Sequence, residues 1–211
     1  MIDILGSLDD KIENNEKIIT NIEVLCREEY RKLTQSSLDL IPLGKIINIF
    51  DGQRIPLSSR EREDKKGRYP YYGATGVLDF VDDFIFSGEY VLIAEDGTVI
   101  DTKGYPIVQL VMGDFWVNNH AHILQAKNGY TNYSLYIALK CTNVSKAVTG
   151  AVQLKINQAN LCKIELPSID SISLSSFNNM IQPLFEKVLH LRKENEKLNE
   201  LKQLYLKKFF G

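Results

Sequence analysis

Two long stripes of apolar residues, one at each end of the chain, constrain the fold more than any other feature. In residues 5–38, apolar side chains recur at spacings of four and three, and Asn15 lies within the same stripe. The apolar members of this stripe are Leu8, Ile12, Ile19, Ile22, Cys26 and Leu33. Such spacing places the side chains on one face of a single α-helix, whose length is unusual for a globular protein.

The second stripe, in residues 175–210, repeats the pattern more cleanly and is flanked by charged residues. Its members are Ile181, Leu184, Val188, Leu191, Asn195, Leu198, Lys202 and Tyr205. A heptad stripe with charged flanks is typical of a coiled coil. We expect Pro183 to lie near the start of this helix, where its missing N–H costs least, or to mark the start itself.

The two stripes also predict how the helices pair. A buried Asn in an apolar seam selects one register, because only a matching polar partner satisfies it. Residues 15–17 and 195–197 both read Asn-Glu-Lys, a weak internal repeat that relates the two helices. Neither helix, each about 45–50 Å long at 1.5 Å per residue, can bury its stripe alone. The middle segment leaves from one helix end and returns to it, so we expect an antiparallel pair.

The middle segment, residues 41–169, is predicted to be mainly β-structure. Stretches rich in Val, Ile and Tyr at 90–94, 107–111 and 120–124 are separated by turn dipeptides, and residues 133–140 form a short predicted helix. The predicted class is α+β, an irregular and mostly antiparallel β-rich domain flanked by two long antiparallel coiled-coil helices. The expected domain bounds are 1–38, 39–170 and 171–211.

Charge is distributed unevenly along a chain whose formal net charge is only −2. Residues 77–102 hold seven acids and no Lys or Arg, whereas residues 115–164 hold five lysines and no acid. This separation permits one basic face on a nearly neutral protein, and only nearby charges matter because salt screens those beyond roughly 8–10 Å.

The three cysteines match neither zinc-ligand spacing nor a disulfide framework. Without a long apolar run or a signal peptide, the protein is expected to be cytoplasmic and not bound to membranes.

Five motifs follow one another at characteristic distances in the middle segment. They are residues 71–77, 88–97, 117–124, 149–157 and 164–167, and residues 8–15 and 197–202 flank them. Together they resemble a target-recognition domain, with its spacer helices, from the DNA-specificity subunit of type I restriction–modification systems. The resemblance covers nearly the whole chain.

The resemblance implies a non-catalytic protein without a cofactor that recognises double-stranded DNA. In this family each recognition domain binds one half of a bipartite site, and the helical spacer sets the gap. Adenine-methylating modification subunits dock on the spacer, and motor–nuclease restriction subunits join the complex. This chain holds one recognition domain where a full subunit has two, so it is a half-subunit or the C-terminal half of a longer chain. We therefore expect a two-fold symmetric homodimer that recognises a palindromic bipartite site.

Candidate site residues follow from charge, polarity and the seams. The expected DNA contacts are Arg54, Arg60, Arg62, Lys65, Lys66, Arg68, Tyr72, Asn119, His120 and Lys155. Gln153 and Asn157 are expected to line the same face as Lys155. The expected spacer and dimer residues are Asn15, Ile19, Ile22, Leu184, Val188, Leu191, Asn195 and Leu198. The segment 60–68 could equally be a solvated loop with no role in binding, because runs of charged residues usually are.

Other interpretations remain open for several residues. Tyrosines in such a stretch lie in the core of a sheet more often than they stack on bases. At least one of Tyr69, Tyr71 and Tyr72 is therefore expected to pack beneath the charged loop. Residues 73–76 fit a tight turn better than a phosphate-binding GxxG loop. His120 and His122 have a metal-compatible spacing but lack a third ligand nearby, so no metal is expected.

Two other protein classes also fit parts of the sequence. Asp51 followed by residues 63–65 (Glu-Asp-Lys) imitates the order found in Mg²⁺-dependent nucleases. A coiled-coil adaptor that binds only protein is the other alternative. A methyltransferase is disfavoured, because no Gly-rich nucleotide turn follows a strand.

Overall fold

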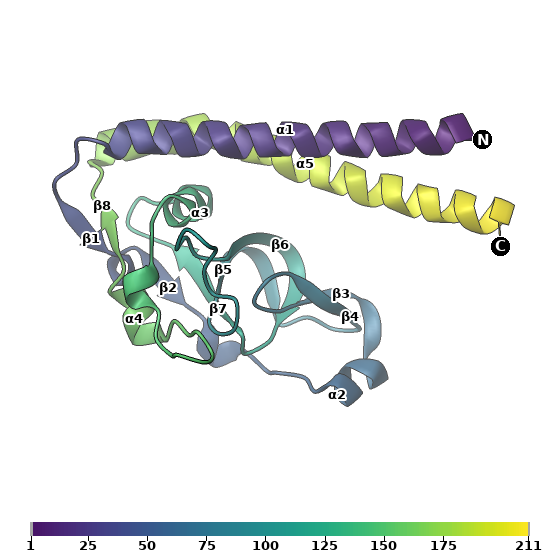
Figure 1. Cartoon of the computed structure of the whole chain (residues 1–211), viewed down its shortest axis with the longest axis horizontal. Helices are drawn as coiled ribbons and strands as arrows, with labels where there is room; N and C mark the ends of the chain where they lie inside the picture. Colours follow the sequence, from purple (N-terminus) through teal and green to yellow (C-terminus); the bar gives the residue numbers. More distant parts are fainter. Residues whose placement is uncertain (1, 211) are drawn as a thin grey trace.

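The computed structural model describes residues 2–210, which form a long helical pair with a β-rich domain attached near one end (Figure 1). Helix α1 (Ile2–Thr34) and helix α5 (Ser171–Phe210) lie side by side and antiparallel. The β-rich domain is inserted between them in sequence and lies beside the end where α1 stops and α5 starts. Both chain termini lie at the opposite end of the pair (Figure 1). Among the described residues, no helix is long and apolar enough to cross a bilayer.

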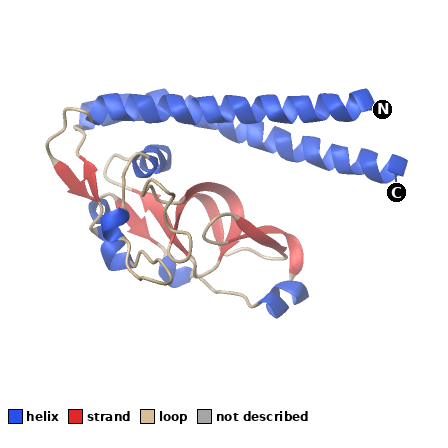
Figure 2. Ribbon diagram, viewed as in Figure 1, coloured by secondary structure: helices blue, strands red, loops and turns tan. Residues whose placement is uncertain are grey.

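The domain is built on a twisted sheet (Figure 2). It has six strands in the order β2-β7-β5-β6-β3-β4. Its strands are β2 (Ile47–Ile49), β3 (Lys66–Tyr72), β4 (Val77–Val81), β5 (Phe86–Ala94), β6 (Val108–Val117) and β7 (Ala121–Ala126). All neighbours are antiparallel except β3 and β6, which pair in parallel. A separate two-stranded ribbon, β1 (Leu40–Pro42) with β8 (Glu165–Pro167), closes the base of the domain. Short helices complete it: α2 (Ser59–Asp64), α3 (Asn132–Lys140), α4 (Gln158–Cys162) and the 3₁₀ turns η1 (Leu43–Lys45), η2 (Asp51–Gln53) and η3 (Ser145–Ala147).

The predicted α+β class with a mostly antiparallel sheet is confirmed. The stretches 90–94, 107–111 and 120–124 lie in or overlap β5, β6 and β7, and the predicted helix 133–140 is α3. The tight turn at 73–76 is also confirmed, since Gly73 N–H donates to the Gly76 carbonyl at 2.8 Å between β3 and β4.

The expected position of Pro183 near a helix start is wrong. Helix α5 begins twelve positions earlier, and Pro183 lies inside it. The Asp170 carboxylate accepts hydrogen bonds from the backbone N–H groups of Ile172 and Ser173 at 3.1 and 3.0 Å, which satisfies the first turn. Pro183 is exposed, so the carbonyl that its missing N–H leaves unpaired lies on the solvent side of the helix.

The two predicted stripes face each other along the helical pair. Ile19, Val188 and Leu191 form a buried cluster with Ile22 packed against it. Polar contacts fix the antiparallel direction at the far end, where Lys202 Nζ lies 2.5 Å from an Asp9 carboxylate oxygen. The spacer helices therefore bury their seams against each other within one chain.

Helix α3 connects the helical pair to the sheet. Tyr133 stacks on Phe185 of α5, with ring centroids 4.8 Å apart and planes 13° from parallel. Tyr136 meets the same Phe185 ring edge-on at 5.9 Å. Phe185 is fully buried, so the domain and the spacer share one continuous core.

Candidate nucleic-acid interface

The residues expected to contact DNA fall into two separate groups in the structure. One group lies on α2 and β3 and contains five cations and Tyr72. The other gathers at the turn between β6 and β7 and contains Asn119, His120 and Lys155. The backbone N–H of Glu95 donates to the His120 carbonyl, and Asp96 pairs with Lys155 in a β-bridge, which joins the members of the second group. Arg54 belongs to neither surface.

Most cations of the α2–β3 group are paired with acids. The Arg62 guanidinium lies 3.3 Å from Asp79, and Lys66 Nζ lies 2.8 Å from the same carboxylate. Lys65 faces Asp82 at 3.9 Å. These acids come from or follow β4, the strand that pairs with β3. The sheet therefore neutralises the basic run that the sequence suggested.

The other side chains of that segment are Arg60, Arg68 and the tyrosines. Arg60 is exposed, and the Arg68 guanidinium lies over the Tyr69 ring at 4.9 Å. Tyr71 is buried, and its hydroxyl oxygen accepts from the Leu57 N–H at 2.9 Å, which confirms that one tyrosine packs beneath the charged segment. Tyr72 is half-buried and meets Phe115 edge-on at 5.8 Å.

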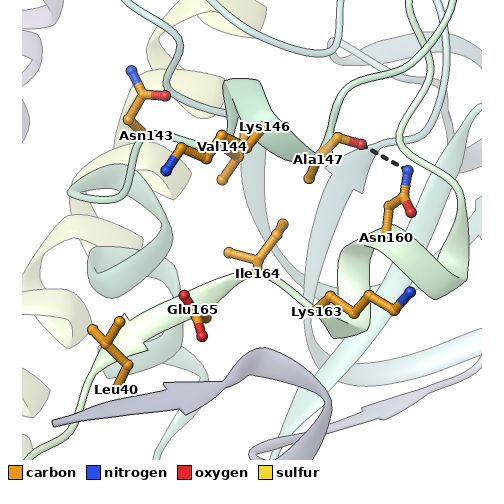
Figure 3. A pocket seen from close by; sticks show the side chains of 9 residues that line it. All are labelled: Leu40, Asn143, Val144, Lys146, Ala147, Asn160, Lys163, Ile164 and Glu165. Atoms are coloured by element: carbon orange, nitrogen blue, oxygen red, sulfur yellow. Dashed lines mark hydrogen bonds between the residues drawn. The ribbon is translucent and has the colours of Figure 1, made fainter.

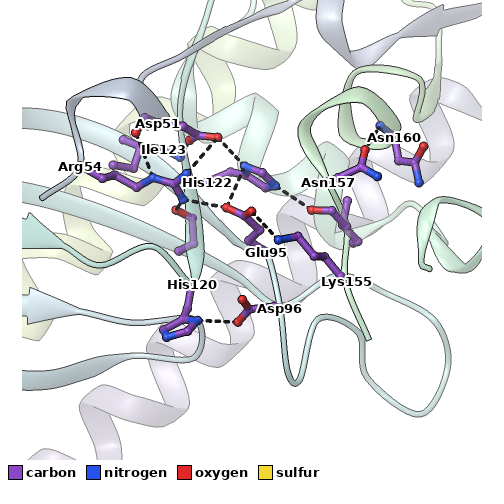
Figure 4. Close-up of polar contacts among 12 residues, drawn as sticks. Asp51, Arg54, Glu95, Asp96, His120, His122, Ile123, Lys155, Asn157 and Asn160 are labelled. Carbon is purple, nitrogen blue, oxygen red and sulfur yellow. Dashed lines mark hydrogen bonds and ion pairs between the residues drawn. The ribbon is translucent and has the colours of Figure 1, made fainter. Parts of the chain in front are cut away.

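Arg54 lies inside a buried ion network (Figure 4) and not on a DNA-facing surface. Its side chain is only 14% exposed, and Nη1 donates to Glu95 at 2.7 Å and to the Ala121 carbonyl at 2.8 Å. A carboxylate oxygen of Asp51 lies 3.7 Å from the same guanidinium. A buried guanidinium costs free energy unless it is paired with carboxylates, and Arg54 finds these partners within the protein itself.

His122 is the centre of this network. Its Nδ1 lies 2.6 Å from Asp51, its Nε2 lies 2.8 Å from the Ile156 carbonyl, and its side chain is 1% exposed. Both ring nitrogens therefore face acceptors, which only the doubly protonated imidazolium can satisfy. Burial lowers the pKa of His122, but the hydrogen bond and charge of Asp51 outweigh it, so the net pKa shift is upward. The pKa values of Asp51 and Glu95 are lowered, because contacts with His122 and Arg54 outweigh burial.

Asp51, Glu95 and His122 place their ligand atoms within 4.8 Å of one another, which is a geometry that can hold a metal ion. Here the positive charge is supplied by side chains instead. Arg54 lies against both carboxylates, and Lys155 Nζ lies 3.2 Å from Glu95. Both nitrogens of His122 are already engaged. We therefore interpret the cluster as an ion network that joins η2, the end of β5, β7 and the segment at 155–156.

The arrangement expected of a Mg²⁺-dependent nuclease is not formed by the residues that suggested it. The Asp51 carboxylate accepts from His122 and from the Ile123 N–H at 3.0 Å. Glu63 lies on α2 and faces Lys66 at 3.4 Å. The carboxylates thus engage different partners on different parts of the domain, and they do not share a metal-sized site.

Sequence reasoning did not single out two lysines beside a surface cavity of about 510 Å³ (Figure 3). Lys146, in η3, and Lys163, directly after α4, lie on either side of Ile164 in its lining, and Glu165 also lines it. Asn160 Nδ2 donates to the Ala147 carbonyl at 3.1 Å and links the two segments. The signal in the sequence was the acid-free stretch that contains both lysines.

Comparisons with known proteins agree on one family. The model of the type I restriction modification DNA specificity domain matches residues 37–170. A Haemophilus influenzae protein described as a type I restriction enzyme specificity subunit is 36% identical over 135 residues, which are 64% of this chain and 34% of that protein. The Escherichia coli type I restriction enzyme EcoprrI specificity subunit is 25% identical over 131 residues, 61% of this chain and 31% of that protein. The chain's matched region thus spans about a third of the length of these relatives.

Solved structures show the same fold over nearly the whole chain. The type I restriction–modification S subunit from M. genitalium superposes with a TM-score of 0.69 at 22% identity, covering 99% of this chain and 59% of that one. The HsdS subunit from Thermoanaerobacter tengcongensis gives 0.51 at 13% identity, covering 98% and 56%. The helical pair is therefore part of the shared architecture.

Proposed function

Because the chain belongs to the family of type I restriction–modification DNA specificity domains, we propose that it recognises DNA as the specificity component of such a complex. The observation that carries the proposal is the family match over residues 37–170, which covers the whole β-rich domain. The helical pair supplies a second feature that a specificity component needs, a stiff element with the recognition domain at one end. We assign the chain no catalytic step, and its role is to select the site at which partner subunits act in the cytoplasm.

The spacer supports recognition of one half of a bipartite site. Helix α5 has 40 residues and is about 60 Å long at 1.5 Å per residue. B-DNA rises about 3.4 Å per base pair, so the rod corresponds to more than one turn of duplex. A second recognition domain at its far end would contact a second half-site at a fixed distance.

We propose that a second copy of the chain supplies this second domain. Apolar side chains stay exposed near the far end of the helical pair, with Ile4 46%, Leu204 66% and Phe209 43% exposed. A two-fold symmetric dimer would cover them and would present identical domains to a palindromic gapped site. Size-exclusion chromatography with light scattering is expected to give twice 24.1 kDa at micromolar concentration. A monomer under these conditions would contradict the dimer but not DNA recognition.

Modification subunits that methylate adenine are the proposed partners on the outer surface of the spacer, and motor–nuclease subunits join through the complex. Co-expression with the modification subunits tests this assembly, and mapping methylated adenines in the host DNA gives the recognised site. A palindromic sequence with a fixed gap is the expected result. Methylation at an asymmetric or ungapped site would refute the symmetric arrangement.

Binding of the chain to DNA is tested directly by titrating labelled duplexes selected from a random library. Affinity is expected to fall steeply with rising salt, because contacts with phosphates release counterions. A protein-binding adaptor would show almost no binding at any salt concentration. A parallel assay for Mg²⁺-dependent nicking is expected to show no cleavage, and cleavage would favour the nuclease alternative.

A further inference from the structure

We infer that the DNA-contacting surface is formed by the loop 149–155 and the adjacent Lys146 and Lys163, and that the α2–β3 segment predicted from the sequence is peripheral to it. The inference rests on the proposed function and specifies which face of the domain approaches DNA and which base pairs it prefers.

Local charge decides between the two surfaces. Residues 58–83 carry five cations and six acids, so 5 − 6 gives a net charge of −1. Residues 143–164 carry three lysines and no acid, but Glu95 pairs with Lys155, Asp96 bridges to it and Glu165 follows, so 3 − 3 gives this surface a net charge of 0. Phosphate attraction acts over roughly 8–10 Å at physiological salt, so local balance outweighs the total charge. The two totals differ by only one unit, so the surroundings of the individual lysines decide which surface attracts phosphates.

Pairing sharpens this difference. Within residues 2–210, no carboxylate lies within ion-pair distance of Lys146 or Lys163. By contrast, Arg62, Lys65 and Lys66 all face acids. A free ammonium group can exchange its water for a phosphate, whereas a paired one must first lose its carboxylate.

The loop 149–155 has a defined shape that is closed by backbone hydrogen bonds. Thr149 and Lys155 exchange two backbone hydrogen bonds of 2.8 Å, which close the base of the loop. Gly150 adopts φ +91°, a conformation that L side chains rarely adopt, and an added Cβ would lie 2.1 Å from the Gln153 carbonyl oxygen. The shape of the loop thus depends on a glycine at this position.

The buried ion network holds this loop in place. Lys155 pairs with Glu95, His122 bonds to the Ile156 carbonyl, and the Ile156 N–H donates to the Glu95 carbonyl at 2.8 Å. The Gly97 N–H donates to the Leu154 carbonyl at 3.0 Å on the other side. Lys155 is therefore a positioning residue, since its ammonium is directed at Glu95. Asp96 nearby is engaged by His120 at 2.6 Å.

The tip of the loop carries chemistry suited to a base pair. Val152 is as exposed as an isolated residue, at 103%, and Gln153 beside it is also exposed. Gln forms paired hydrogen bonds with N6 and N7 of adenine in the major groove, and an apolar side chain packs on the methyl group of thymine. The tip therefore fits an A·T-containing step, with Lys146 and Lys163 contacting the adjacent phosphates.

The experiment compares two double variants of the full chain on a duplex selected by the wild-type protein. Lys146→Ala with Lys163→Ala is expected to reduce the slope of log affinity against log salt by about two, since each phosphate contact contributes about 0.9. Lys65→Ala with Lys66→Ala is the matched control and is expected to leave the slope nearly unchanged. The reverse result, a reduced slope only in the control, would overturn the inference while leaving DNA recognition intact.

A second variant tests base contact. Gln153→Ala is expected to lower the preference for one A·T pair by roughly 5- to 100-fold in a library selection, without changing the salt slope. Gln203→Ala, an exposed glutamine on α5, is the control and is expected to keep the wild-type preference. An unchanged preference in Gln153→Ala would exclude this tip from base recognition. Absence of salt-dependent binding by the wild-type protein, alone and with modification subunits, would instead refute the proposed function.

Discussion

Asn15 of α1 donates a hydrogen bond from Nδ2 to Oδ1 of Asn195 of α5 at 2.8 Å, across the buried seam of the helical pair. Asn195 in turn donates to Glu16 at 2.7 Å, and Asn15 also donates to Glu194 at 2.8 Å. Both asparagines are nearly inaccessible to solvent. A shift of either helix by one turn would place an amide against apolar side chains, so this pair defines the register of the spacer.

Replacement of Asn15 by Leu is expected to destabilise the protein by about 1–3 kcal/mol, because it leaves the Asn195 carbonyl buried without a donor. The double variant Asn15→Leu with Asn195→Leu is expected to recover most of this loss, since an apolar pair has no desolvation cost. Thermal unfolding followed by circular dichroism measures both. Asn14→Leu, at an exposed position on α1, is the control and should change stability by less than about 0.5 kcal/mol. An Asn15→Leu variant as stable as the control would show that the pair contributes nothing.

Phe185→Ala is expected to cost about 3–5 kcal/mol, because it empties the site where Tyr133 and Tyr136 of α3 pack on α5. The loss should also loosen the domain from the spacer, and faster amide exchange in α3 measures this. Lys187→Ala, exposed on α5, is the control. A cost below about 1 kcal/mol for Phe185→Ala would mean that the shared core does not join the two parts.

The sequence predicted the elements whose signals are local. Helical spacing identified both spacer helices and the Asn pair, since residues three and four apart share a helix face. The position of Pro183 was misjudged, because proline is expected in the first turn of a helix, whereas α5 continues through it and Asp170 accepts from the first N–H groups. The parallel pairing of β3 with β6 could not be predicted, since it joins Tyr71 to Trp116 across 45 positions.

The candidate site was harder to predict than the fold, because its charges are balanced across the sheet. Arg54 looked like a DNA contact, yet its partner Glu95 lies 41 positions away in sequence. Asp51 was considered only for a nuclease, and nothing local indicated that it would meet His122, 71 positions later. The acid-free stretch was the useful signal, but which lysines stay unpaired depends on where the acids of other strands lie.

A matched pair of glycines tests the β3–β4 hairpin. Gly67→Ala would place a Cβ 2.3 Å from Asp82 Cα and 2.4 Å from the Val81 carbonyl oxygen, so the strands must separate. We expect a cost of about 1–3 kcal/mol, as for other overpacked sites. Gly52→Ala meets no atom within 4 Å and should be close to neutral. Equal unfolding free energies for the two variants in urea would contradict the close strand contact.

The ion network predicts a stability profile with a defined sign on its alkaline side. The pKa of His122 is raised in the folded protein above its ordinary value of 6.5. A group with a raised folded pKa stabilises fully below its unfolded pKa, and this contribution is lost as pH rises through the folded pKa. The lowered pKa values of Asp51 and Glu95 act in the opposite direction, and their contribution is lost in acid.

His122→Gln is therefore expected to be most destabilising near pH 6, by about 3–5 kcal/mol, because it leaves Asp51 buried beside one fewer cation. The difference in unfolding free energy between wild type and variant should shrink as pH rises from the ordinary pKa of 6.5 through the raised folded pKa, where the wild-type imidazolium loses its proton. Urea unfolding at several pH values between 6 and 10 measures this difference. His190→Gln removes an exposed imidazole from α5 and controls for the loss of a histidine in general. A difference for His122→Gln that stays constant or grows with pH would show that His122 is neutral in the folded protein, and that Asp51 and the Ile156 carbonyl are held together by other means.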